Sequence, residues 1–203
     1  MAMSEVLQHI SQRSSTLIHP EALGQLHIRT GRIVACDPLV SHNKPFERTV
    51  PTGSYPVIAW WHSDEERIAA AELRLSEAKA VRWEMATRPG QLISELKEGY
   101  TYGYPVDTGL GCFGDEAAIH AMNEMEDRLE RELGDDFISF YDDAVADVLA
   151  EHNDDWGVLS VDQQSGLNVI MFSTGYGDGF YTSYWGFDEE DKLVALVTDF
   201  KIL

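Results

Sequence analysis

The sequence predicts an α+β fold: a mostly antiparallel β-sheet of N- and C-terminal strands, with two central acidic helices packed on it. Strand-like alternation dominates residues 26–86 and returns at residues 156–200, whereas helical periodicity is confined to residues 115–152. Strands and helices are thus segregated along the chain, which is typical of antiparallel sheets. With 203 residues and 44% hydrophobic content, the chain is long enough to bury a core without disulfides.

We expect two parts in the chain. Residues 1–24 are predicted to form a polar leader with a short helix over residues 5–13, and residues 25–203 to form a single α+β domain. No internal repeat, low-complexity segment or linker rich in Pro, Gly or Ser is evident.

Four segments in the first half have the composition of strands: residues 26–38, 55–61, 67–75 and 80–86. The first also suits a hairpin, with a turn near Thr30-Gly31 and a stop at Pro38. Residues 67–75 are ambiguous, because their alanines favour a helix while the polar and apolar positions that follow alternate. The same alternation returns at residues 80–86 and favours a strand, with a helix as the alternative. Residues 41–54 are turn-rich, and residues 91–98 suit a short helical turn.

Two helices are predicted in the middle of the chain. Asp115 is the expected N-cap of the first, which ends at Gly134. Its apolar stripe consists of Ala118, Met122, Met125 and Leu129. The second spans residues 137–152, with an apolar stripe of Phe140, Ala144, Val148 and Leu149.

The last quarter predicts four strands, at residues 156–161, 168–172, 180–187 and 193–200. Turn-forming residues separate them at 162–166, 175–179 and 188–191.

The charge is strongly asymmetric. The net charge is −20, of which residues 1–100 contribute −1 and residues 101–203 contribute −19. Residues 115–155 hold 15 acids against two arginines. Such a field repels phosphate backbones, so we expect that the protein does not bind nucleic acid. Two interpretations remain for the acidic stretch, namely a solvated helical face and a docking surface for a basic partner, with Asp142, Asp143 and Asp147 as its contact residues.

Other features exclude further classes. No apolar run reaches about 18 residues, so we expect no membrane span. The N-terminal segment is polar and lacks the apolar core of a secretory signal. Two cysteines are too few for a disulfide scaffold or a zinc site. We therefore expect a reduced, cytoplasmic protein with no cofactor and no bound metal.

The glycine-rich segment at residues 175–179 contains Asp178 between two glycines. It suits a tight turn between two strands, because Asp-Gly is a strong turn signal. The functional alternative presents Asp178 at a strand end beside Tyr181 and Trp185 as a catalytic carboxylate. The segment is not a dinucleotide-binding motif, since no helix is expected after it.

A second glycine-rich segment, residues 109–115, carries Cys112 just before the predicted helix. A cysteine in such a loop can act as a nucleophile if a base lies nearby, but no histidine occurs in a recognisable partner motif; the alternative is a buried small hydrophobe. Asp107 precedes this segment and is a second candidate carboxylate.

The aspartates expected in loops could also gather around a divalent cation: Asp37, Asp107, Asp115, Asp178 and Asp199. No calcium-loop pattern is present. The five tryptophans suit the core better than a ligand platform.

Several segments, taken in order, resemble an uncharacterised bacterial family catalogued as domain of unknown function 4241. They are residues 31–39, 50–57, 82–86, 106–109 with 112–113, 177–179 with 184–186, and 196–200. The resemblance covers about residues 25–200, and Gly114 departs from it where a bulkier residue is expected. It implies an intracellular bacterial protein but no transferable catalytic set. Small acidic proteins of this kind often serve as immunity partners of secreted toxins, which is an association at the level of the family.

Two hypotheses of different classes follow. The first is a non-enzymatic protein-binding module, such as a toxin-neutralising immunity protein, that captures a basic protein through its acidic second half. The alternative is a small hydrolase or ligand-binding enzyme that uses Asp178 and Asp107 at glycine-rich loops. They differ in whether these carboxylates and Cys112 converge in one concave pocket. A structural or regulatory domain with a small-molecule ligand is held in reserve.

Overall fold

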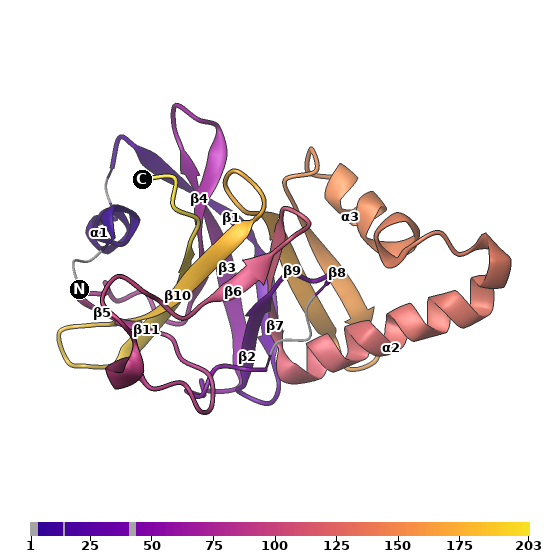
Figure 1. Cartoon of the computed structure of the whole chain (residues 1–203), viewed down its shortest axis with the longest axis horizontal. Helices are drawn as coiled ribbons and strands as arrows, with labels where there is room; N and C mark the ends of the chain where they lie inside the picture. Colours follow the sequence, from indigo (N-terminus) through magenta and orange to yellow (C-terminus); the bar gives the residue numbers. More distant parts are fainter. Residues whose placement is uncertain (1–3, 14, 41–43) are drawn as a thin grey trace.

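The computed structural model describes residues 4–13, 15–40 and 44–203. Over these residues, eleven strands form two antiparallel sheets, and three α-helices pack against them (Figure 1). The predicted α+β class with antiparallel pairing is confirmed. None of the helices in the described part of the chain combines the length and apolar character needed to cross a membrane.

The larger sheet has the strand order β1-β3-β4-β11-β10-β5, and β6 pairs with β10 beside this path. Its strands are β1 (Ile18–Ile28), β3 (Gly53–His62), β4 (Arg67–Arg74), β5 (Arg82–Met85), β6 (Tyr104–Val106), β10 (Gly179–Phe187) and β11 (Leu193–Asp199). The smaller sheet has the order β2-β7-β9-β8. Its strands are β2 (Ile33–Cys36), β7 (Leu110–Asp115), β8 (Trp156–Asp162) and β9 (Leu167–Ser173).

Three apolar cores hold the layers together. The main core lies between the sheets and includes Leu73, Phe113 and Phe172. A second core joins the smaller sheet to α2 (Glu116–Leu133), the π-helical turn η3 (Tyr141–Val145) and α3 (Ala146–Ala150). A third joins α1 (Glu5–Gln12) to the outer face of the larger sheet. Because α1 covers that face, β4 is buried on both sides, which explains the weak alternation of residues 67–75 and confirms the strand.

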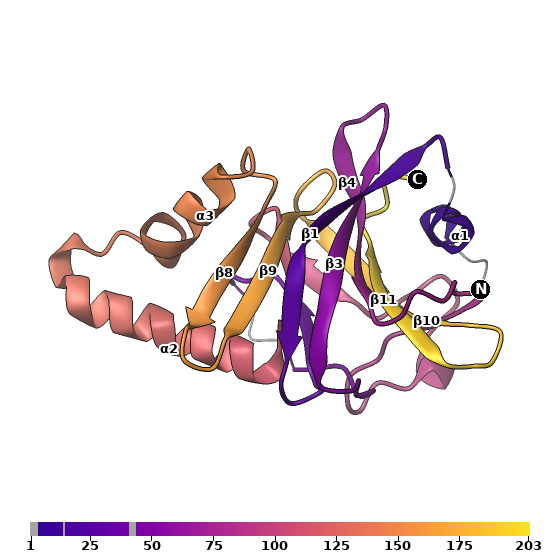
Figure 2. The same ribbon diagram turned by 180° about the vertical axis from the view of Figure 1, so that it is seen from behind.

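The N-terminal region differs from the expected leader. The short helix is present as α1, but residues 18–24 belong to β1, which pairs with β3 from Ile18↔His62 to Ile28↔Gly53. β1 is an edge strand with many exposed polar positions, so its sequence lacks the apolar content of the central strands. Figure 2 shows β1 and β3 beside β9 and β8 of the smaller sheet. The turn at Thr30-Gly31 therefore passes from one sheet to the other and does not close a hairpin.

The glycine-rich segment before α2 is strand β7 and not a loop. A Cβ at Gly111 would lie 2.9 Å from side-chain atoms of both Phe172 and Thr174, and one at Gly114 would lie 2.7 Å from Ile119 Cδ1. These glycines allow close packing on both faces of the strand. Close packing also explains why Gly114 replaces the bulkier residue expected there.

The two predicted helices have different outcomes. α2 is confirmed, with Asp115 as its N-cap and Gly134 at its end. The second helix is shorter than residues 137–152, because it begins with the π-helical turn η3 and continues as α3 to Ala150. Its start is fixed by Asp143, whose carboxylate accepts a hydrogen bond from the backbone N–H of Ile138 at 2.9 Å. A side chain that binds the preceding backbone in this way holds it outside the helix.

Candidate functional site

Two buried aspartates join β2 and β7 in a reciprocal arrangement. Asp37 follows β2, and its carboxylate accepts hydrogen bonds from the backbone N–H of Asp107 and of Thr108, both at 3.0 Å, and from the Thr108 hydroxyl at 2.9 Å. Asp115 ends β7, and its carboxylate accepts from the backbone N–H of Arg29 at 3.2 Å and of Thr30 at 2.9 Å, and from the Thr30 hydroxyl at 2.9 Å. Each strand therefore ends in a carboxylate that fixes the loop before the other strand.

This arrangement, which we call the double aspartate clamp, has a sequence signature that the sequence reasoning missed. Thr30-Gly31 precedes Asp37, and Thr108-Gly109 precedes Asp115, with five residues between Gly and Asp in both cases. Both glycines have positive φ, 78° at Gly31 and 71° at Gly109. The side chains of Thr30, Asp37, Thr108 and Asp115 in this repeat therefore have structural roles. Asp37 and Asp115, which are 1% and 0% exposed, therefore hold backbone and are not free to gather around a cation.

The structure brings Asp107 and Asp178 to neighbouring loops. β6 pairs with β10 so that Val106 lies opposite Gly179. Asp107 follows Val106 and Asp178 precedes Gly179, so the two aspartates are the next residues beyond this antiparallel pair. The Thr174 hydroxyl lies 3.0 Å from the Gly109 carbonyl and 2.8 Å from the Gly177 carbonyl, which holds the loops together. The predicted turn at residues 175–179 exists, but it links β9 of the smaller sheet to β10 of the larger one. Both carboxylates are exposed.

Cys112 lies apart from these carboxylates. It is fully buried in β7, in the core beneath α2, and its Sγ is 3.6 Å from the Sγ of Cys36 on β2. The hydrogen bond with Cys36 and burial raise the pKa of the Cys112 thiol well above its ordinary value. A nucleophilic cysteine needs the opposite shift and access to solvent. The geometry therefore favours the small buried hydrophobe over the nucleophile.

The acidic stretch forms a projecting element. We call residues 124–143 the acidic arm; it comprises the C-terminal half of α2, the turn η2 (Gly134–Asp136) and the start of η3. It carries nine acids and two arginines, and Figure 1 shows it reaching beyond the smaller sheet at the right of the view. Three large apolar side chains are exposed on it, Leu133 (38%), Ile138 (75%) and Tyr141 (38%).

The three predicted contact residues have different roles. Asp142 and Asp147 are exposed, whereas Asp143 is half-buried and binds the backbone at the start of the helix. Asp142 also takes part in a capping contact, since its backbone N–H donates to the Ser139 hydroxyl at 3.1 Å. Asp143 is therefore less accessible to a partner than predicted. Asp135 and Asp136, which are exposed on η2, add accessible negative charge to the arm.

A pocket of about 470 Å³ lies where the arm meets the double aspartate clamp. It is lined by Leu39, Thr108, Gly109, Leu110, Tyr141, Leu149, Asp154 and Ser173. Neither Asp107 nor Asp178 is among these residues, so the concave surface and the two candidate carboxylates are separate.

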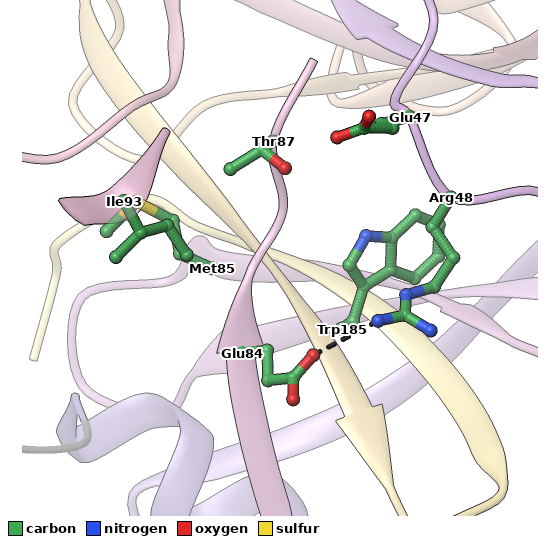
Figure 3. A pocket seen from close by; sticks show the side chains of 7 residues that line it. All are labelled: Glu47, Arg48, Glu84, Met85, Thr87, Ile93 and Trp185. Carbon is green, nitrogen blue, oxygen red and sulfur yellow. Dashed lines mark hydrogen bonds and ion pairs between the residues drawn. The ribbon is translucent and has the colours of Figure 1, made fainter. Parts of the chain in front are cut away.

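A pocket of about 530 Å³, which we call the indole pocket, lies at the other end of the larger sheet (Figure 3). It is lined by Glu47, Arg48, Glu84, Met85, Thr87, Ile93 and Trp185. Trp185 comes from β10, Glu84 and Met85 from β5, and Ile93 from the short 3-10 helix η1 (Ile93–Glu95). The sequence predicts Trp185 in the core or beside Asp178. Its place in this pocket follows from the pairing of β5 with β10, which the local sequence pattern does not encode.

A family model described as a protein of unknown function (DUF4241) matches residues 26–198. The chain belongs to this family. No curated protein and no solved structure matches it. Family membership therefore confirms the resemblance without supplying a role for the residues above. Among the described residues of this DUF4241 chain, no group of three or more His, Cys, Asp or Glu side chains is placed to share a metal ion.

Proposed function

We propose that the chain is a protein-binding module that docks a basic protein through its acidic arm. The observation that carries this proposal is the combination, on one projecting element, of nine acids against two arginines with the exposed side chains of Leu133, Ile138 and Tyr141. A purely solvated face has no need of exposed Ile and Tyr side chains. Protein interfaces place apolar and aromatic anchors inside a polar rim, and the arm has both components.

The charge of the arm specifies the partner. A carboxylate-rich surface attracts a basic protein from a distance and repels acidic proteins and nucleic acids. A basic toxin that the chain neutralises as an immunity protein is a partner of this kind. The genes that flank this one offer a first check, because a secreted toxin domain encoded beside it would support that form of the proposal.

The hydrolase alternative receives less support from the geometry. Asp107 and Asp178 lie on neighbouring loops but are exposed outside the pocket of about 470 Å³, and Cys112 is buried beneath α2, apart from both. Catalysis by these groups requires convergence around one reacting atom.

Photo-crosslinking tests the proposal at single positions. A photoreactive residue replaces Ile138, which is 75% exposed on the arm, and in a control it replaces Val81, which is 54% exposed beside β5 at the far end of the molecule. In a lysate of the native cell, position 138 is expected to capture a basic protein that position 81 does not. Capture of the same proteins at both positions, or of none at position 138, would contradict the proposal.

A further inference from the structure

We propose that the indole pocket binds an organic cation in which a guanidinium or ammonium group lies near a hydrogen-bond acceptor such as a carbonyl. β5 and η1, which line part of the pocket, lie at the opposite end of the molecule from the acidic arm (Figure 1). The inference therefore stands independently of the proposed protein partner. It rests on an indole N–H that has no protein acceptor and faces the pocket, on an unpaired carboxylate and on the lining of the pocket.

The donor without a protein acceptor is the indole N–H of Trp185. Trp185 is 2% exposed, and its Nε1 donates to no atom of the residues that the structure describes. Other tryptophans in the same sheet differ, because Trp60 donates to Glu72 at 2.9 Å and Trp61 to Glu21 at 2.7 Å. This indole nitrogen is not among the fully buried side-chain atoms that lack a partner, so it is open to the pocket and can donate to a bound molecule. Figure 3 shows this nitrogen facing the space bordered by Thr87 and Glu47, where a ligand would supply the acceptor.

The charges around the pocket select a cation. Arg48 is engaged by Glu84, with Nη2 to Oε2 at 3.1 Å, and its guanidinium lies 5.0 Å from the centroid of the Phe187 ring. Glu84 is also paired with Arg82. In contrast, the exposed carboxylate of Glu47 forms no ion pair or hydrogen bond with the described residues. The charge left for a ligand at this pocket is therefore negative.

The remaining lining suits a small ligand with an aliphatic stem. Met85 and Ile93 supply apolar surface, and the volume of about 530 Å³ lies within the range of small-molecule sites. The rim is preorganised, because the backbone N–H of Glu47 donates to the Thr87 carbonyl at 2.8 Å. An arginine or lysine side chain with its neighbouring amide has this combination of stem, cation and acceptor.

Nuclear magnetic resonance of the indole N–H groups tests the proposal. The Trp185 resonance is identified by its loss in W185F, and the probes are N-acetyl-arginine amide and its neutral isostere N-acetyl-citrulline amide. We expect the arginine probe to shift the Trp185 resonance saturably at millimolar concentration, with binding about tenfold weaker for the citrulline probe, or about 1.4 kcal/mol. Free arginine is a further probe: binding of both arginine forms indicates a free small molecule, and binding of only the blocked form indicates a peptide side chain.

Variants complete the test. Glu47→Gln removes the unpaired carboxylate at an exposed position and is expected to weaken arginine binding about tenfold, like the neutral probe. Glu189→Gln is the matched control, since Glu189 is exposed in the β10–β11 turn outside the pocket. The proposal is overturned if no probe shifts the Trp185 resonance, if both probes bind equally, or if Glu47→Gln has no more effect than Glu189→Gln.

Discussion

Removal of the Asp115 carboxylate should separate the first turn of α2 from the loop before β2. In Asp115→Ala, the backbone N–H groups of Arg29, Thr30 and Ala117 lose their acceptor, as does the Thr30 hydroxyl. Hydrogen bonds to a charged group contribute about 1.5–3 kcal/mol each, but removal of the charge also removes its desolvation cost. We therefore expect a net loss of about 3–5 kcal/mol in the free energy of unfolding, mostly from donors left unpaired in a buried site.

Thermal unfolding measures this loss directly. For a chain of this size, about 4 kcal/mol corresponds to a fall of roughly 10 °C in Tm. Glu116→Ala is the matched control, because the Glu116–Arg32 ion pair begins the same helix but is partly exposed, so it should cost less than about 1 kcal/mol. Asp115→Asn keeps one oxygen and should fall between the two variants.

Amide hydrogen exchange locates the effect. In Asp115→Ala, the Thr30 amide should lose protection while the Thr108 amide, which is held by Asp37, keeps it, and Asp37→Ala should give the reverse pattern. If Asp115→Ala is no less stable than Glu116→Ala, or if both amides lose protection together, the reasoning behind the double aspartate clamp is refuted.

Two further predictions concern buried titratable groups. Because Cys112 is fully buried and the Cys36 contact and burial raise its pKa, a thiol reagent at pH 7 should label Cys112 only as fast as the protein opens; immediate labelling of the folded chain would reinstate a reactive cysteine. Burial raises the pKa of the Asp199 carboxyl above its ordinary 3.8, so folding favours the protonated form of this group. The protonated carboxyl therefore stabilises the folded state at low pH, and this contribution is lost as the pH rises through the raised pKa. Asp199→Asn should therefore raise Tm at pH 7, and the gain should shrink towards pH 4 and below; a variant that is less stable at pH 7 would contradict this sign.

Features encoded locally were predictable from the sequence. α2 begins after Asp115 and ends at Gly134, because both the cap and the stop are short-range signals. The strands of the last quarter also match their predicted segments, since each is bounded by turn-forming residues.

Features that depend on distant packing were not predictable in this way. The segment around Gly111 and Gly114 has the composition of a loop, but it forms strand β7. The glycines are needed there because the side chains of Phe172 and Ile119 pack against them, and these residues are not neighbours in the local sequence pattern. Likewise, neither Asp107 nor Asp178 carries a signal for the pairing of β6 with β10 that brings them together. Long-range pairing of this kind is set by the whole sheet and not by local propensity.

The site was predictable only in part. The acidic arm follows from charge counting, but the exposure of Ile138 and the helix-starting role of Asp143 required the structure. The double aspartate clamp could have been found, because Thr-Gly-x5-Asp occurs twice. The indole pocket could not, since its lining comes from β5, β10, η1 and the segment that contains Glu47.

The association rate between this chain and the protein captured at position 138 tests the docking proposal most directly. The arm variant replaces three exposed acids of the acidic arm, Glu132 with Gln and Asp135 and Asp136 with Asn, and the control replaces the exposed Glu95, Glu98 and Glu189 with Gln. Between 0.01 and 0.15 M salt the screening length falls from about 30 to about 8 Å, so steering by the arm should fade over this range. We predict that the wild type and the control associate markedly more slowly as salt rises, while the arm variant is slower at low salt and much less sensitive to it. An association rate that is indifferent to salt and equal in all three proteins would contradict docking through the acidic arm.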